Sequence, residues 1–248
     1  MKHRAIIGVI VSISTIFFIS CSKNSINSFN KTDSYTKEDC AEYTYKVNGD
    51  NLIVDNTCSA LKITKSDSDE IKISMKKSVG GSKEELLQEA LDNIKCTFKD
   101  NTLKIGPEKG DESLITSKNI EATISIPNAI TTLDMESKVG DIDLEGDYDR
   151  LKLDEKVGNL LYKGDLKQGS IISDVGEVEL NLKSLDSSNK YDIKSNVGEV
   201  KIVVPKKSTI NLTGPSAKNV KLPEDIISSS DGATFEIDSK VSNTRMED

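Results

Sequence analysis

The chain has 248 residues, of which 35% are hydrophobic, 30% are charged and 4% are aromatic, and its formal net charge at pH 7 is −8. Nucleic-acid binding depends on lysines and arginines that neutralise phosphates, so we expect no nucleic-acid partner for so acidic a chain. The sequence also lacks a GxxxxGKS motif and a strand-linked GxGxxG motif, which leaves nucleotide binding without support.

The N-terminus has the pattern of an exported protein. Lys2, His3 and Arg4 precede a mostly apolar run over residues 5–20. This run is short for a membrane-spanning helix, which needs roughly 20 apolar residues, and it is typical of a secretory signal peptide. It ends in the tetrapeptide Phe18–Cys21, which resembles the lipobox of bacterial lipoproteins, although Phe18 stands where an aliphatic residue is usual.

The lipobox resemblance implies that residues 1–20 are a lipoprotein signal peptide and that Cys21 becomes the lipidated new N-terminus. Two acyl chains suffice for stable anchoring. The expected location is therefore extracytoplasmic, at the outer face of a bacterial cell membrane. An uncleaved anchor and an ordinary signal peptide are the alternatives.

Cleavage after residue 20 would also change the available chemistry. It would remove Lys2 and Arg4, which makes the chain still more acidic, and it would remove His3, the single histidine. Without histidine, activation of a Ser or Cys nucleophile by His is excluded. The cysteines that remain after Cys21 are Cys40, Cys58 and Cys96, and both one disulfide and none are compatible with that number.

The chain beyond Cys21 divides into a polar segment and a repetitive one. Residues 21–40 are poor in aliphatic side chains, and we expect a lipidated cysteine followed by a flexible tether. Residues 41–245 contain short apolar alternations such as Leu61/Ile63 and Leu103/Ile105, separated by Gly, Asn, Asp and Ser. This period of two predicts strands and a β-repeat domain.

One helix interrupts the strands at about residues 82–95. Ser82 and Glu85 have the spacing of a capping box, and apolar residues then recur at helical spacing from Leu86 to Ile94. We expect a short amphipathic helix that packs on the strands, with a partner-binding helix as the alternative.

Four copies of one short pattern occupy the C-terminal half. Each has Val-Gly, then an acidic residue or Asn, then alternating aliphatic residues. The first three copies follow one another at a fixed step, the fourth follows after a slightly longer one, and a degenerate fifth copy spans residues 239–242. The copies are Ser137–Leu144, Glu155–Tyr162, Ser173–Leu180 and Ser195–Ile202, with Gly140, Gly158, Gly176 and Gly198 at the shared position.

This repetition predicts the architecture. A unit this short cannot bury a core alone, so neighbouring copies must stack. Aligned apolar columns, such as Ile142 with Leu160 and Leu144 with Tyr162, fit parallel strands about 4.8 Å apart. The glycine fits a corner with positive φ or without room for a Cβ atom. We therefore expect an all-β fold, a single-stranded β-solenoid of roughly 18–22-residue repeats, with a meander or β-sandwich as the alternative.

The run from Val139 to Val204 resembles the bacterial DUF4097 family of β-strand-repeat proteins, whose members are labelled as candidate adhesins. The resemblance covers roughly residues 41–241. It implies a secreted or surface-anchored domain, with some members linked to envelope stress. It carries over no catalytic residues and implies no cofactor.

Carboxylates are the remaining candidates for chemistry. Asp141, Asp143, Asp147 and Asp149 are candidate calcium ligands, although they match no known calcium-loop spacing. Glu177 and Glu199 should lie on neighbouring strands, where like charges repel. We expect a non-enzymatic adhesion, scaffold or envelope-stress-associated module with an envelope protein or glycan as partner. A polysaccharide-active β-helix enzyme, for which Asp141 and Asp143 could supply the carboxylates, and a calcium-binding surface protein are the alternatives.

Overall fold

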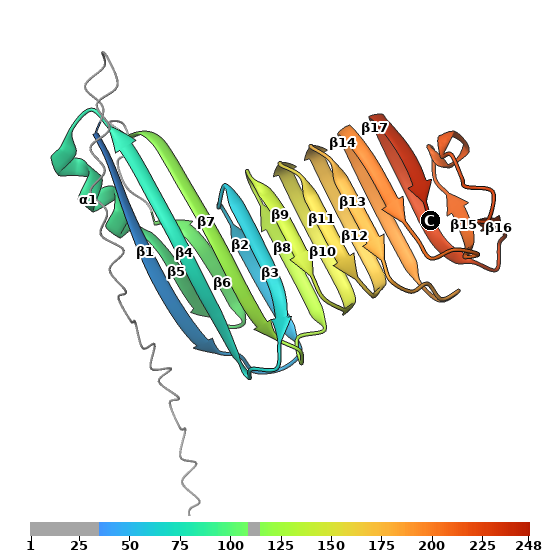
Figure 1. The fold of residues 1–248 in the computed structure, drawn as a ribbon, viewed down its shortest axis with the longest axis horizontal. Coiled ribbons are helices and arrows are strands. Elements are labelled where there is room, and N and C mark those ends of the chain that lie inside the picture. The colour runs from blue at the N-terminus through green and yellow to red at the C-terminus, as the bar shows by residue number, and fades with distance from the viewer. Residues whose placement is uncertain (1–34, 109–114) are drawn as a thin grey trace, which may run out of the picture.

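The computed structural model describes residues 35–108 and 115–248 (Figure 1). Within these ranges the protein is mostly β, with one α-helix and one short 3-10 turn. The predicted signal peptide and Cys21 lie outside the described residues. None of the described helices is long and apolar enough to cross a membrane.

The strands belong to one sheet of 17 strands. In chain order they are β1 (Tyr35–Lys46), β2 (Asn51–Asn56), β3 (Ala60–Ser66), β4 (Glu70–Gly81), β5 (Ile94–Lys99), β6 (Thr102–Pro107), β7 (Ile115–Pro127), β8 (Thr132–Ser137), β9 (Asp141–Glu145), β10 (Tyr148–Val157), β11 (Leu160–Gly164), β12 (Leu166–Val175), β13 (Val178–Leu182), β14 (Lys190–Val203), β15 (Thr209–Thr213), β16 (Ile227–Ser228) and β17 (Ala233–Glu247).

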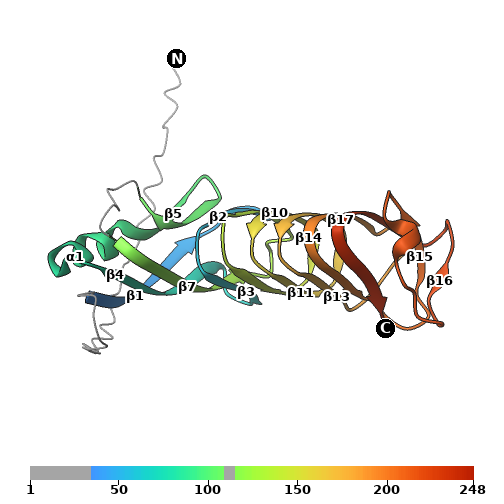
Figure 2. The same cartoon turned by 90° about the horizontal axis from the view of Figure 1, so that it is seen from above.

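The repeats form two rows of parallel strands. One row runs β2, β8, β10, β12 and the first half of β14; the other runs β3, β9, β11 and β13 to the second half of β14. β17 pairs with β14 along both halves and so continues both rows. The sheet therefore curls back on itself into a nearly closed, barrel-like shape around one core (Figures 1 and 2).

The aligned apolar columns form this core, as predicted. The side chains of the first column, Ile142 to Val200, and of the second, Leu144 to Ile202, are at most 1% exposed. Burial of each such side chain contributes about 1.5–3 kcal/mol. The valines that precede the four repeated glycines form a third aligned column, but this column lies outside the core. Between 46% and 58% of the surface of each is exposed: Val139, Val157, Val175 and Val197.

The strands that precede β8 form both parallel and antiparallel pairs. β6 and β7 pair in parallel with β2 and β3, so they extend the two rows. β5 then pairs antiparallel with β6, β4 antiparallel with β7, and β1 antiparallel with β4. This antiparallel part lies at the N-terminal end of the stack (Figure 1).

Helix α1 (Glu84–Asn93) packs on this end and buries Leu87 and Leu91, as the apolar spacing predicted. The predicted capping box is wrong. β4 continues to Gly81, so the turn into the helix is short, Lys83 occupies the N-cap position, and no side chain caps the first turn.

The start of the β structure also differs from the prediction. β1 begins at Tyr35, inside the segment expected to be a tether and ahead of the predicted boundary at residue 41. Among the described strands, β1 pairs only with β4 and is therefore an edge strand. Edge strands are often polar, so this one has no clear apolar alternation in the sequence.

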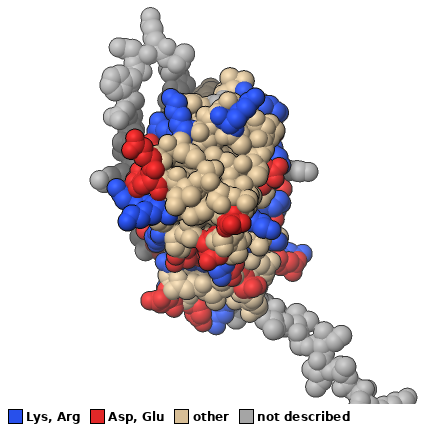
Figure 3. Space-filling model, turned by 90° about the vertical axis from the view of Figure 1, so that its right-hand side faces the viewer, with Lys and Arg blue, Asp and Glu red and all other residues tan. Residues whose placement is uncertain are grey.

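At the opposite end, β15 pairs with β17 and with the short β16. Figure 3 looks onto this C-terminal end, where a broad uncharged area is bordered by acidic and basic side chains.

Candidate binding face

The repeated glycines form the corner between the two rows. Gly140, Gly158, Gly176 and Gly198 have φ values between +119° and +155°. A Cβ atom on Gly158 would lie 2.1 Å from the carbonyl oxygen of Gly140, and one on Gly176 would lie 1.6 Å from that of Gly158. Each turn of the chain therefore contacts the glycine backbone of the previous turn directly.

After this corner, alternate residues point outward and form part of what we call the charged face: the outer side of β4, β7, β3, β9, β11, β13 and the second halves of β14 and β17. The register places Asp143 beside Lys62 and Leu161, and Glu179 beside Leu161 and Lys201. Side chains of opposite charge thus meet on neighbouring strands, which favours pairing.

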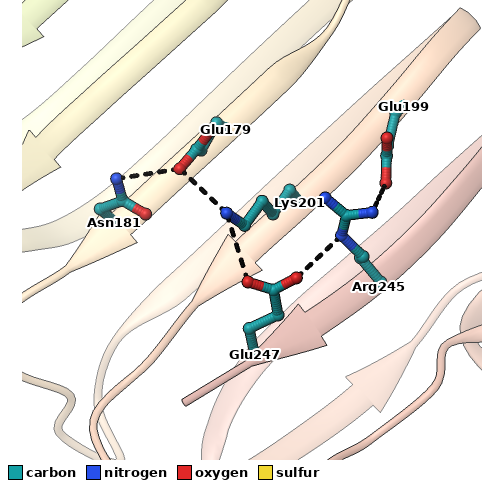
Figure 4. Close-up of polar contacts among 6 residues, drawn as sticks. All are labelled: Glu179, Asn181, Glu199, Lys201, Arg245 and Glu247. Atoms are coloured by element: carbon teal, nitrogen blue, oxygen red, sulfur yellow. Dashed lines mark hydrogen bonds and ion pairs between the residues drawn. The ribbon is translucent and has the colours of Figure 1, made fainter.

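An ion-pair network joins the last three strands of this face (Figure 4). Lys201 Nζ lies 3.3 Å from Glu179 and 3.2 Å from Glu247. Arg245 contacts Glu247 at 3.0 Å and Glu199 at 2.6 Å. The two glutamates raise the pKa of Lys201, Glu247 more strongly than Glu179. Surface pairs contribute little singly, but this network links β13, β14 and β17.

Of the two like-charged residues expected on neighbouring strands, Glu177 and Glu199, one has a neutralising partner. Arg245 neutralises Glu199, whereas the Glu177 carboxylate has no hydrogen-bond or ion-pair partner within the described ranges. Arg245 follows the last, degenerate copy, so the repeat pattern did not predict its role.

A shallow groove of about 560 Å³ crosses the charged face near Ala60. Two lysines line it, Lys62 and Lys76, and both pair with carboxylates, Lys62 with Asp143 at 2.9 Å and Lys76 with Glu38 at 3.7 Å. The groove is acidic, because five carboxylates line it: Glu121, Asp141, Asp143, Glu177 and Glu179.

Three of these carboxylates have no ion pair with a described lysine or arginine. They are Glu121, Asp141 and Glu177, and they follow one line across the strands. Ala60 separates Glu121 from Asp141, and Asn159 separates Asp141 from Glu177. Two strand spacings of about 4.8 Å put successive carboxylates roughly 10 Å apart. Glu121 precedes the repeats and belongs to no motif, so the sequence pattern did not predict its place in this line.

The four calcium candidates lie in two separate places and already have protein partners. Asp141 accepts hydrogen bonds from the backbone and side chain of Asn159, at 3.0 and 2.9 Å. Asp147 accepts one from the Asp165 backbone at 2.9 Å. Lys167 lies 2.6 Å from Asp149 and lowers its pKa. Across residues 35–108 and 115–248, no three His, Cys, Asp or Glu side chains are grouped as metal ligands would be.

Two of the three cysteines that follow Cys21 lie in the core. Cys58 and Cys96 are buried, and burial raises the pKa of both thiols to about 12. No disulfide joins cysteines in the described part of the chain.

Comparison with known proteins gives distant structural neighbours. No protein-family model and no curated protein matches the chain. A candidate adhesin from Bacteroides fragilis is 15% identical, with a TM-score of 0.41, over 88% of this chain and 97% of that one. A candidate cell adhesion protein from Clostridium sporogenes is 17% identical, with a TM-score of 0.35, over 86% and 99%. A candidate adhesin from Parabacteroides merdae is 11% identical, with a TM-score of 0.34, over 87% and 97%. These likenesses are too remote to assign a function.

Proposed function

We propose that the chain is a non-enzymatic surface lipoprotein whose β-repeat domain binds a cationic segment of an envelope protein or glycan in the groove of the charged face. The line of carboxylates Glu121, Asp141 and Glu177, which form no ion pair with a described lysine or arginine, carries this proposal. Opposite charge favours encounter and register of a partner on such a face.

The proposed partner is extended, because the carboxylates are spread along a line. A positive charge about every 10 Å would meet one carboxylate after another. The groove-lining residues include no aromatic side chain, so the platform on which carbohydrate-cleaving sites hold a sugar ring is missing from this lining. This argues against glycoside hydrolysis in the groove and favours a partner held by its positive charges.

We further propose that the nearly closed sheet is a β-solenoid of the DUF4097 type. The in-register parallel pairs between equivalent positions of successive copies support this, for example Leu153 with Ile171 and Tyr162 with Leu180. Such a stack would present the groove on a stiff surface.

The binding proposal is tested with the variant Glu121→Gln/Asp141→Asn/Glu177→Gln. Asp141→Asn keeps an oxygen that can accept the Asn159 hydrogen bonds. We expect the variant to lose most binding of an oligolysine peptide at low salt, and to capture fewer envelope components than the native chain. The matched control is Glu136→Gln/Glu236→Gln/Asp238→Asn, which removes the same charge from the opposite row. Equal binding by all three proteins would refute the proposal.

Anchoring is tested separately with Cys21→Ala. We expect this variant to lose lipid labelling and membrane retention, because the acyl chains would have no attachment site. Unchanged labelling and retention would contradict the anchor and leave the groove proposal intact.

A further inference from the structure

A buried polar column runs along the inner side of the glycine corner. It consists of side chains that are in register on successive strands, each at most 1% exposed. We call this set the inner polar column: Asn56, Ser137, Glu155, Ser173 and Ser195.

Glu155 is the charged member of this column. Both of its carboxylate oxygens are inaccessible and have no hydrogen-bond partner within the described residues, and the same holds for the hydroxyl of Ser173 on the next strand. Asn56 donates a hydrogen bond to Ser137, at 3.1 Å. An ionised carboxylate without a partner is very costly to bury.

No cation among the described side chains neutralises Glu155. Lys156 follows it in sequence but points outward, where it pairs with Asp154 at 2.8 Å and Asp174 at 3.3 Å. Lys138, which directly follows β8 near the column, is exposed to solvent. The charged group that acts on Glu155 is Asp141 at the start of β9, which has the same sign.

The Glu155 side chain is fully buried and lines none of the three grooves at Ala60, Arg150 and Thr64. A proton is the one cation that needs no cavity. Protonation removes the charge of the carboxylate and with it most of the cost of burying the group.

We propose that Glu155 is a proton-binding site that makes the stack of repeats sensitive to external pH. At acidic pH, Glu155 is a neutral carboxylic acid in the folded protein. Loss of its proton places a negative charge between the turns that carry Ser137 and Ser173, and this weakens the corner there. The aligned copies have Ser at this position, so the fold itself does not require Glu.

The raised pKa of Glu155 agrees with its burial. Burial and, secondarily, Asp141 raise the pKa of Glu155 from 4.5 to about 7. A group whose pKa is raised by folding holds its proton more tightly in the folded state. Its contribution is therefore fully present below the unfolded pKa of 4.5, declines as pH rises, and is lost once pH passes about 7.

The first test is direct titration of the carboxyl carbons of the ¹³C-glutamate-labelled chain by NMR. We expect one signal, absent in Glu155→Gln, to titrate near pH 7, well above the usual glutamate value of about 4.3. Titration of that signal at the usual value would overturn the proposal.

The second test compares unfolding of the native chain, Glu155→Gln and Glu136→Gln, an exposed control on β8. From about pH 5 to about pH 8 we expect the unfolding constant of the native chain to rise on the order of 10²-fold relative to that of Glu155→Gln. Glu136→Gln should behave like the native chain. Glu155→Ser, which restores the repeat residue, replaces Glu155→Gln if that variant does not fold. The same pH dependence in a Glu155 variant as in the native chain would also overturn the proposal.

Discussion

At the scale of single residues, the corner glycines are the positions at which the backbone leaves least freedom. Gly158 has a φ of +155°, and a Cβ atom added to it would lie 2.1 Å from the Gly140 carbonyl oxygen. Alanine there must both adopt a rare conformation and push neighbouring turns apart. We expect Gly158→Ala to destabilise the fold by about 3 kcal/mol or more, measured by urea unfolding.

Gly49 allows the cost of the backbone conformation to be measured without the steric clash. Its φ is +87°, but an added Cβ atom would meet nothing closer than 3.8 Å. Gly49→Ala should therefore cost only the conformational penalty, about 1–2 kcal/mol. If both variants lost the same stability, close contact between the turns would not be the reason for glycine at the corner.

At the scale of elements, helix α1 depends on a lysine from the neighbouring strand. Lys77 Nζ, on β4, donates hydrogen bonds to the carbonyl oxygens of Leu91 at 2.7 Å and Ile94 at 3.3 Å, and it pairs with Asp39 at 3.4 Å. It is 5% exposed. The C-terminal end of the helix is thus satisfied by a side chain that a local sequence pattern cannot reveal.

Lys77→Met should remove both of these hydrogen bonds, leave the Leu91 carbonyl with the Ile94 backbone N–H alone, and destabilise the protein by about 1–3 kcal/mol. Hydrogen exchange should rise in α1 before it rises in the repeats. The adjacent Lys76 is the control, because it is exposed and pairs with Glu38 at 3.7 Å. Lys76→Met should change stability by less than about 0.5 kcal/mol. Equal effects of the two substitutions would show that Lys77 does not hold the helix.

Features that repeat along the sequence could be predicted from it, whereas features made by contacts between distant segments could not. Core columns such as Leu144 with Tyr162 repeat at a fixed step, so both their burial and their pairing were evident. The parallel pairing of β6 with β2 joins unrelated segments, and a period of two does not encode strand direction. Glu121 enters the groove through such a pairing, so the acidic line was only partly predictable. Glu155 was visible as the single Glu at a Ser position, but its isolation required the packed corner.

At the scale of the whole molecule, the stack should tolerate loss of one complete turn. Deletion of residues 158–175 joins Val157 to Gly176, so the corner sequence Val-Gly is restored. β10 can then pair with β14 in the register that β12 had, because each turn contacts only its neighbours. Deletion of residues 158–166 removes half a turn and leaves β12 facing the wrong row.

We expect the full-turn deletion to unfold cooperatively in urea, with an m-value reduced in proportion to the surface lost, and to keep the β-type circular dichroism of the full chain. The half-turn deletion should lose cooperativity, because the apolar columns no longer meet inside the core. If both deletions unfolded in the same way, stability would not come from stacking in register, and the β-solenoid proposal would be refuted.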